Sequence, residues 1–313
     1  MIKIDIVHIF TDNIMAVFLK EIHLNGKKNM PALHHKIGFI GAGNMGQAMI
    51  GALIASGCAA PENVFVSDVS RARIHDLAKT YGIVALPDNA SIIQSSDIII
   101  FAVKPQSLDA LLSEMAEAHA FQNATGKKIL ISIAAGFPIR KYEKYVYAGL
   151  DSERGKRLPI LRVMPNTPAL VLAGMSGLCG NAFAGKKDMD IAATILSAMG
   201  KVIRCNENDM DAITAMSGSG PAYCFYVVEA MIGAGTRLGL SPENAAELTL
   251  ATFKGALALL ESQNISPEAL RQKVTSPGGT TEAAIRVLES RMVKQAFSDA
   301  ISAAAERSKE LSK

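Results

Sequence analysis

The sequence has little of what metal sites, disulfide frameworks or membrane spans require. Its 313 residues include six histidines, four cysteines and no tryptophan. The cysteines show neither paired nor CxxC spacing, which favours reduced thiols in a cytoplasmic protein over a disulfide framework or a zinc site. The apolar runs, such as 98–103 and 129–135, have strand length, well below the roughly 18 residues of a membrane-spanning helix. The four cysteines are Cys58, Cys179, Cys205 and Cys224.

A strong charge of either sign is also absent. The chain has 32 Lys and Arg against 29 Asp and Glu, a formal net charge of +3 that is scattered along the sequence. This balance argues against a nucleic-acid partner. Hydrophobic residues make up 49% and charged residues 19%, which describes a packed globular chain and excludes general disorder. The length is sufficient for about two domains.

The first 35 residues do not fit the pattern that follows them. They are apolar but interrupted by charges, and they lack the continuous apolar core and small-residue cleavage site of a signal peptide. Met30 lies just before the first expected strand. We therefore treat residues 1–35 as an N-terminal extension, in which residues 1–29 are either loosely attached or belong to a misassigned start.

From Ile37 onward, short β-branched runs alternate with segments of helical period, as in a parallel sheet with crossover helices. The runs at 97–103 and 128–134 are apolar on both faces, which is typical of central strands covered by helices on both sides. The predicted strands are 37–40, 63–67, 83–85, 97–103, 128–134, 160–163, 175–179 and 201–204, and the helices between them include 44–56, 70–80, 107–119 and 186–199.

After about Glu207 the strand signal stops, and residues 209–313 are expected to be helical. Ser-Pro pairs at 241–242, 266–267 and 276–277 interrupt this region, and Ser-Pro before an apolar-periodic run predicts a helix start. The helix at about 222–239 has few charges and must be buried, either in a core of its own or, as we favour, in a helical dimer interface. We predict an α/β fold: a Rossmann-like, mostly parallel sheet at 36–207, followed by an all-helical dimerisation domain at 208–313.

A glycine-rich turn follows the first strand. Gly41-Ala42-Gly43-Asn44-Met45-Gly46 has the form G-x-G-x-x-G and opens a helical run, which is the context that makes this motif specific for dinucleotides. Gly41 permits the tight turn, Gly43 lets the backbone approach a pyrophosphate, and Gly46 allows close packing of helix on strand. The helix N-terminus then offers free N–H groups to the phosphates.

The end of the second strand leaves the choice of cofactor open. Asp68 is suited to accept hydrogen bonds from an adenosine ribose, which favours NADH. Arg71 and Arg73 follow closely, and either could pair with the 2′-phosphate of NADPH. A solvated helix face explains both arginines equally well.

No histidine is available for alcohol chemistry in the helical region. Four of the six precede the first strand and the last is His119, whereas a hydroxy-acid dehydrogenase needs a histidine on the substrate side. Reduction of a C=N bond fits better, because a protonated imine already carries the charge that attracts hydride. The segment 275–281 (Thr-Ser-Pro-Gly-Gly-Thr-Thr) is a set of N–H and O–H donors suited to a carboxylate, although a capped helix without a ligand is equally compatible with it.

Several motifs together resemble the pyrroline-5-carboxylate reductase family. They occur in family order from residue 36 to about 310, and only 1–35 are uncovered. The motifs are Ile37-Gly38-Phe39-Ile40-Gly41-Ala42-Gly43-Asn44-Met45, Ala102-Val103-Lys104-Pro105, Ile133-Ala134-Ala135-Gly136, Met164-Pro165-Asn166-Thr167-Pro168, Met216-Ser217-Gly218-Ser219-Gly220-Pro221-Ala222-Tyr223 and the segment 275–281.

The resemblance implies reduction of L-1-pyrroline-5-carboxylate to L-proline by NADPH or NADH, in a homodimer that often assembles into a homodecamer. It implies Thr281 and Glu207 as catalytic residues, with the Thr281 hydroxyl directed at the ring nitrogen. The implied substrate-binding residues are Ser276, Gly279, Thr280 and Thr281. The implied cofactor-binding residues are Ile40, Gly41, Ala42, Gly43, Asn44 and Met45 at the pyrophosphate, Ser67, Asp68 and Asn89 near the adenosine, and Ala102, Val103, Lys104, Pro105, Ile133, Ala134 and Ala135 at the nicotinamide half.

Two departures and two rival functions remain. Asp68 stands where many members have Ser or Arg, and Asn264-Ile265-Ser266-Pro267 replaces a Glu-x-His-Pro-like stretch. One rival is a β-hydroxyacid dehydrogenase or imine reductase, although the former places a catalytic lysine on the long helix after the first domain and this chain has none between Lys201 and Lys254. The other rival is a non-catalytic dinucleotide sensor.

Overall fold

The computed structural model describes residues 30–313, so the predictions for residues 1–29 lie outside the described residues. The chain divides into two compact units. The first comprises the residues up to Gly218 together with Glu306–Lys313, and the second comprises Ser219–Ala305. The boundary predicted after residue 207 falls earlier than this division, and the sequence does not foresee the return of residues 306–313 to the first unit. Residues 30–35 form no helix or strand, and the Leu33 N–H donates to the Cys58 carbonyl (2.8 Å).

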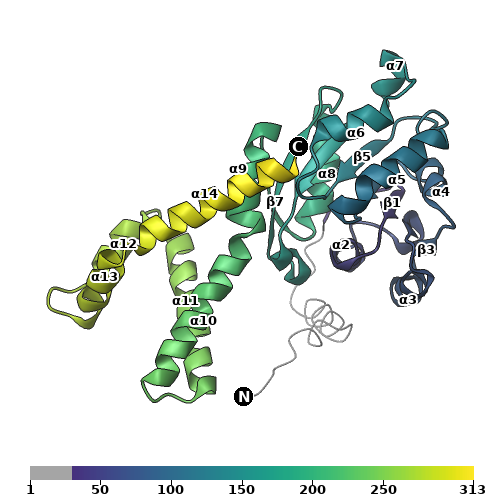
Figure 1. Cartoon of the computed structure of the whole chain (residues 1–313). Coiled ribbons are helices and arrows are strands. Elements are labelled where there is room, and N and C mark those ends of the chain that lie inside the picture. Colours follow the sequence, from purple (N-terminus) through teal and green to yellow (C-terminus); the bar gives the residue numbers. More distant parts are fainter. Residues whose placement is uncertain (1–29) are drawn as a thin grey trace. The chain divides into compact units, whose positions relative to one another are not determined.

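The first unit is built on one sheet of eight strands in the order β3-β2-β1-β4-β5-β6-β7-β8 (Figure 1). All neighbouring strands are parallel except β6 and β7, which are antiparallel. Every predicted strand is present. Four are shorter than predicted, among them 97–103 and 128–134, whose apolar pattern runs on into the following turns, and three are one or two residues longer. The strands are β1 (Ile37–Ile40), β2 (Val64–Ser67), β3 (Val84–Ala85), β4 (Ile98–Phe101), β5 (Ile129–Ser132), β6 (Ile160–Met164), β7 (Gly174–Gly180) and β8 (Gly200–Arg204).

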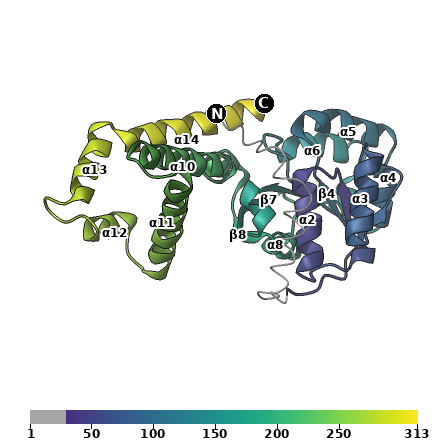
Figure 2. The ribbon, with the colours of Figure 1, turned by 90° about the horizontal axis from the view of Figure 1, so that it is seen from below.

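Helices cover both faces of this sheet (Figure 2). One hydrophobic core joins α2, α3 and α8 to alternate side chains of the strands, and a second core joins α4, α5 and α6 to the intervening ones. Strands β1, β4 and β5 are buried along their whole length, as their apolar sequences predict. The helices of this unit are α2 (Asn44–Ala55), α3 (Arg71–Tyr81), α4 (Asn89–Ser95), α5 (Pro105–Glu117), α6 (Ile139–Val146), α7 (Ser152–Gly155), α8 (Lys186–Ser197) and α9 (Met210–Ile213).

Short turns of other helix types complete the first unit. They lie mostly at strand ends and at the exit towards the second unit. They are the 3₁₀-helices η2 (Pro61–Asn63), η3 (Thr167–Val171) and η4 (Glu207–Asp209) and the π-helix η5 (Thr214–Gly218). The predicted Rossmann-like fold is confirmed.

The second unit is helical, as predicted. Ser241 and Ser266 cap the helices that follow them, each accepting from a backbone N–H (3.2 Å). Ser276-Pro277 does not start a helix, because the chain turns again at Gly278 (φ +70°) and α13 begins at Thr280. The helices are α10 (Gly220–Arg237), α11 (Pro242–Ser262), α12 (Pro267–Lys273), α13 (Thr280–Ser290) and α14 (Val293–Leu311), the last of which ends in the first unit.

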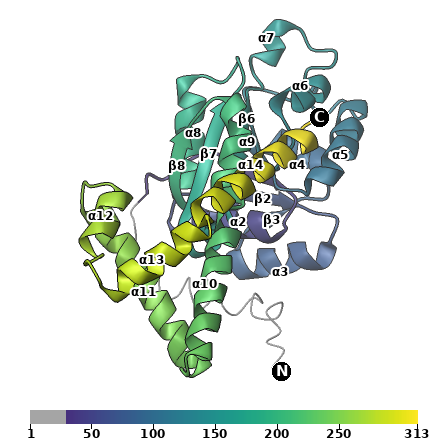
Figure 3. The ribbon, with the colours of Figure 1, turned by 60° about the vertical axis from the view of Figure 1, so that its left-hand side comes forward.

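Helix α10 packs along α11 (Figure 3), with Gly235 close to Ala245. It has no buried residue, and Phe225 and Tyr226 are 67% and 72% exposed. The reading in which α10 lies in a core of its own copy is therefore wrong, and its apolar surface requires another covering. None of the described helices is long and apolar enough to cross a membrane.

Candidate functional site

The glycine-rich turn after β1 leaves its backbone open to a ligand. Gly41 has φ +95°, a backbone conformation that residues with a side chain rarely adopt. A Cβ on Gly46 would lie 2.9 Å from the Gly41 carbonyl oxygen, so this close approach also requires glycine. A Cβ on Gly43 would meet nothing within 4 Å. Gly43 is also the N-cap of α2, and no side chain caps this helix. The first-turn N–H groups of α2 therefore have no side-chain cap, which leaves them available to a pyrophosphate.

The strand order brings the implied cofactor residues to one edge of the sheet. Strands β2, β1, β4 and β5 are neighbours and parallel, so the segments 40–45, 67–68, 102–105 and 133–135 all lie at or just beyond their carboxyl ends. This is the edge at which doubly wound folds bind ligands. Asn89 joins them from the start of α4, where its side-chain oxygen accepts from the Ser67 hydroxyl (2.7 Å).

Asp68 is engaged within the protein. Its carboxylate accepts from the Ala42 N–H (2.7 Å) and the Ser70 N–H (2.8 Å), and it pairs with Arg73 at 3.3 Å. The Asp68 side chain is only 7% exposed. This carboxylate therefore ties the glycine-rich turn to the end of β2, and the Arg73 guanidinium is held by it.

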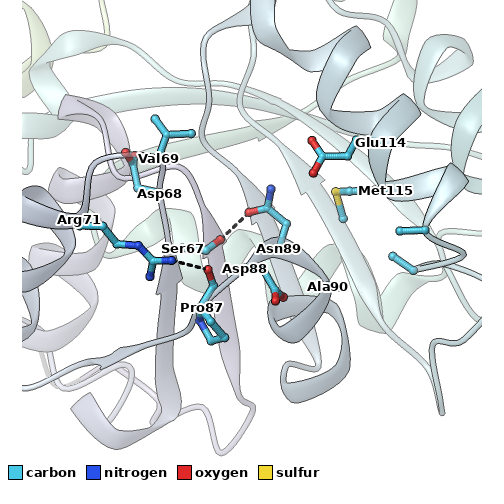
Figure 4. Close-up of a pocket in the computed structure, with 12 residues that line it drawn as sticks. Ser67, Asp68, Val69, Arg71, Pro87, Asp88, Asn89, Ala90, Glu114 and Met115 are labelled. Atoms are coloured by element: carbon cyan, nitrogen blue, oxygen red, sulfur yellow. Dashed lines mark hydrogen bonds between the residues drawn. The ribbon is translucent and has the colours of Figure 1, made fainter.

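A cavity of about 490 Å³ lies beside the end of β2 and the start of α4 (Figure 4). Arg71 lies along it and donates to the Pro87 carbonyl (3.2 Å), and the Ser67 hydroxyl, which also lines the cavity, donates to Asn89 Oδ1. Asp88 caps α4 through the Ser91 N–H (2.7 Å), and this hydrogen bond lowers the pKa of the Asp88 carboxyl. Arg71 is the cation that lines this cavity, which Asp88 and Glu114 also line.

Glu207 holds two groups beyond the carboxyl end of β5. Its Oε1 accepts from the Ile139 N–H at the start of α6 (2.6 Å) and from Arg162 Nη1 (3.3 Å). The Arg162 side chain is 5% exposed, so Glu207 supplies the partner that a buried guanidinium needs. Ser132 and Tyr142 share a buried hydrogen bond (2.6 Å) beside them, and burial raises the pKa of the Tyr142 phenol well above its usual range.

The donor segment 275–281 lies in the second unit. Glu282 accepts from the Gly278 N–H (2.8 Å), and Thr275 donates to the Arg271 carbonyl (2.6 Å). Gly279 is the N-cap of α13, and no side chain caps that helix. The hydroxyls of Ser276, Thr280 and Thr281 therefore take no part in capping α13. The four implied substrate residues lie at the turn before α13 (Ser276 and Gly279) and in its first two residues (Thr280 and Thr281).

Comparisons with known proteins identify the family. Residues 207–311 match a family model described as pyrroline-5-carboxylate reductase dimerisation, and residues 36–136 match one described as NADP oxidoreductase, coenzyme F420-dependent. The pyrroline-5-carboxylate reductase of Methanosarcina acetivorans is 40% identical over 280 residues, which cover 90% of this chain and 99% of that protein. That of Corynebacterium melassecola is 39% identical over 277 residues, 88% of this chain and 98% of that one. The chain belongs to the pyrroline-5-carboxylate reductase family.

Solved structures agree with this membership. The structure of a pyrroline-5-carboxylate reductase from Coxiella burnetii is 38% identical, with a TM-score of 0.79 over 90% of this chain and 100% of that one. The pyrroline carboxylate reductase of Plasmodium falciparum with NADP bound is 32% identical, with a TM-score of 0.78 and the same coverage. The resemblance predicted from the motifs is confirmed: the protein is an oxidoreductase of this family, and its helical region carries the family's dimerisation domain. These comparisons do not favour the two rival functions, a β-hydroxyacid dehydrogenase or imine reductase and a non-catalytic dinucleotide sensor.

Sequence reasoning missed several residues near the candidate site. Arg162 stands in the apolar strand β6, and an isolated cation in such a strand is the one signal that could have singled it out. Ser132 and Tyr142 gave no signal, because their hydrogen bond joins β5 to α6, an unpredicted helix. The sequence predicts no metal, and this stays a prediction. The described residues contain no group of three or more His, Cys, Asp or Glu side chains that could hold a metal ion.

Proposed function

We propose that this protein reduces L-1-pyrroline-5-carboxylate to L-proline, the last step of proline biosynthesis, with a hydride from NADPH or NADH. The observation that carries the proposal is the pairing of two sites in one chain of this family. The N-terminus of α2, which no side chain caps, follows the glycine-rich turn at the carboxyl edge of the sheet, and the N-terminus of α13, which no side chain caps, carries the hydroxyls of Thr280 and Thr281 in the dimerisation domain.

The first unit would hold the cofactor, and its residues fit one. Residues 40–45 would bind the pyrophosphate through the free N–H groups of α2, because Gly43 leaves the approach open. Residues 102–105 and 133–135, at the ends of β4 and β5, would line the nicotinamide half. When bound, the nicotinamide supplies the hydride.

At the adenosine end we propose that NADPH is preferred over NADH. The Asp68 carboxylate already accepts two backbone N–H groups and pairs with Arg73, which leaves it poorly placed to accept from a ribose hydroxyl. Arg71 lines the adjacent cavity beside Asn89 and is placed to pair with a 2′-phosphate. Arg71→Gln should weaken NADPH binding roughly tenfold and leave NADH binding unchanged. Lys79→Gln, at the far end of the same helix, is the control, and cofactor fluorescence measures both dissociation constants.

The second unit would hold the substrate. Ser276, Gly279 and Thr280 would bind the carboxylate, and the Thr281 hydroxyl would bond the ring nitrogen and orient the imine. The hydride adds to the carbon of the C=N bond, and the nitrogen keeps its proton as the product amine, so no strong general acid is needed. The Glu207 carboxylate is committed to Ile139 and Arg162, so its part in the reaction would be to position the residues that follow β5.

We propose a homodimer formed through the helical unit, assembled further into a homodecamer, and a cytoplasmic location without nucleic-acid or membrane partners. The exposed apolar side chains of α10 and α11 support a second copy as the covering of these helices. The free thiols, of which Cys58 and Cys179 are buried, are consistent with a reducing compartment.

The decisive test is oxidation of NADPH and of NADH, followed by absorbance, with racemic pyrroline-5-carboxylate as substrate and piperideine-2-carboxylate as the control imine. Turnover with pyrroline-5-carboxylate that exceeds turnover with the control supports the proposal. Cofactor binding without turnover of either imine would replace it with the non-catalytic sensor, and preference for the control imine would replace it with a different imine reductase.

A further inference from the structure

The end of α14 docks onto the first unit through a small set of specific contacts. We call Glu306–Lys313 the C-terminal clasp. The Ser308 hydroxyl donates to Asp211 Oδ1 of α9 (2.6 Å), and Arg140 of α6 donates to the Ser312 carbonyl (2.7 Å). Ser308 is 4% exposed, whereas its partner Asp211 is half-buried. In Figures 1 and 3 the C-terminus lies beside α6.

The clasp also contacts the loop that leaves β5. Gly136 adopts φ +68°, and a Cβ placed on it would lie 3.0 Å from the Leu311 Cβ. The loop 136–138 joins the segment 133–135, at the carboxyl end of β5, to the first residue of α6. The clasp therefore contacts the first residue of this loop, Gly136, and also Arg140, the second residue of α6.

Two further hydrogen-bonded groups hold the same connection from within the unit. Glu207 accepts from the Ile139 N–H (2.6 Å), and the Ser132 hydroxyl, which is bonded to Tyr142, accepts from the Ala134 N–H (3.3 Å). The contacts at Ala134, Gly136, Ile139 and Arg140 all lie on the segment between Ser132 and Arg140, and the Ser308–Asp211 hydrogen bond anchors the clasp to α9. A segment held at so many points is fixed in position, as a surface that must present a reactant in one geometry needs to be.

The clasp is better suited to fixing position than to adding stability. Leu311 is 55% exposed, so it buries little apolar surface, and the remaining contacts are single hydrogen bonds. The two apolar cores of the first unit are formed without any residue of the clasp.

We propose that the C-terminal clasp positions the nicotinamide half of the cofactor site, with Ser308, Asp211 and Arg140 as positioning residues. The clasp holds the loop 136–138, and this loop fixes residues 133–135 at the end of β5. The inference rests on the proposed function only in assigning residues 133–135 to the nicotinamide. Loosening the clasp would leave adenosine and pyrophosphate contacts intact and would disturb the alignment for hydride transfer.

The test compares Ser308→Ala, Asp211→Ala, the double variant and Arg140→Gln with the wild-type protein. We expect kcat to fall roughly tenfold in Ser308→Ala, since small misplacements of reacting atoms carry large rate penalties. The primary deuterium isotope effect with 4-deuterated NADPH should rise, while the Kd for NADPH changes little. Asp211→Asn, which retains an acceptor oxygen, should restore much of the rate, and the double variant should lose no more than either single one.

Hydrogen exchange of the backbone between residues 133 and 139 gives a readout that needs no turnover. Exchange should accelerate there in Ser308→Ala and in Arg140→Gln, whose exposed side chain can be replaced without burying an unpaired group. Ser113→Ala, which removes an exposed Ser–Glu hydrogen bond on α5, is the matched control and should leave exchange and kcat unchanged.

Unchanged exchange at 133–139 in the folded variants would overturn the proposal, as would a loss of kcat that only tracks a fall in Tm. If the wild-type protein fails to turn over pyrroline-5-carboxylate, the proposed function fails separately. The exchange measurement and the NADPH Kd then still decide whether the clasp controls this loop.

Discussion

The two units of this protein bury their apolar residues in different ways. In the α/β unit, strands and helices of one chain enclose two hydrophobic cores, and β1, β4 and β5 are buried throughout. Among residues 219–305 only Ala245 and Thr249 are buried, although α10 and α11 are rich in Ala, Leu and aromatic residues. An apolar sequence therefore indicates burial in both units, but only in the first does the partner surface lie in the same chain.

The largest effect is expected where the helical unit depends on a second copy. Phe225→Asp places a charge at an exposed apolar position of α10 (67% exposed). The dimer dissociation constant should rise at least about a thousandfold, because losing a buried Phe costs about 3–5 kcal/mol and each dimer carries two copies. Analytical ultracentrifugation measures the change.

Val171→Asp provides the control for this comparison. Val171 is 44% exposed in the α/β unit, whose cores are complete, and assembly should be unaffected. If both variants dimerise as the wild-type protein does, the contrast between a closed and an open unit is wrong.

Cofactor binding should depend on the α/β unit alone. Gly43 has φ −68°, which any residue adopts, so Gly43→Val should fold, but its side chain would occupy the approach to the α2 N-terminus. We expect the Kd for NADPH to rise at least about a hundredfold through steric exclusion of the pyrophosphate. Gly185→Val, at the N-cap of α8 with a similar extended backbone, should leave that Kd unchanged. Retained affinity in folded Gly43→Val would refute the pyrophosphate assignment.

Substrate recognition should depend on the helical unit. Thr281→Ala should lower kcat/KM for the imine roughly ten- to a hundredfold, the effect of one oriented hydrogen bond, and leave the Kd for NADPH unchanged. Thr281→Ser keeps the hydroxyl and should recover most of the loss. An unaltered kcat/KM in Thr281→Ala would mean that this residue serves the helix and not the substrate.

The smallest expected effect is a loss of stability at high pH that arises in the α/β unit and not in the helical unit. Burial raises the pKa of Tyr147 to about 12, and its hydroxyl donates to the Leu158 carbonyl (2.8 Å). The folded state favours the neutral phenol, so this stabilisation is complete below the usual tyrosine pKa of about 10 and is lost as the pH rises towards 12. Allowing for partial exposure, the free energy of unfolding should fall by about 1–2 kcal/mol over this range.

Urea unfolding from about pH 8 to about pH 12 measures this loss. Tyr147→Phe should flatten the decline. Tyr226→Phe, at an exposed position of the helical unit, should not. An equal flattening in both variants would remove Tyr147 as the source.

The elements that the sequence predicted well are those with strong local patterns. All eight strands and α2, α3, α5 and α8 were found, because long apolar runs and helical periods suffice to mark them. Helix α4 is not predicted, because it spans only 89–95 and its start is defined by the Asp88 cap. The helix start predicted at Ser276-Pro277 is wrong, because Gly278, with φ +70°, turns the chain before α13 begins.

The sequence predicts which residues form the candidate site. It does not predict the hydrogen bonds and ion pairs that these residues make with one another. Spacing marks Asp68 as a ribose acceptor, but the carboxylate turns inward to the Ala42 and Ser70 N–H groups. The partnership of Glu207 with Arg162 joins η4 to β6, and that of Ser308 with Asp211 joins the end of α14 to α9. Such pairs leave no periodic trace in the sequence, because they join residues that only folding brings together.

By itself the sequence determined the alternation of strands and helices, the glycine-rich turn, the donor loop and the family, because each depends on residue types at short spacing. The tertiary structure decided which polar groups are already occupied, which loop the last residues of the chain hold, and that the helical unit lacks a core of its own. Those features depend on burial and on hydrogen bonds between distant segments. A side chain of the right type at the right spacing can still be unable to bind a ligand, because it is already hydrogen-bonded to another part of the fold.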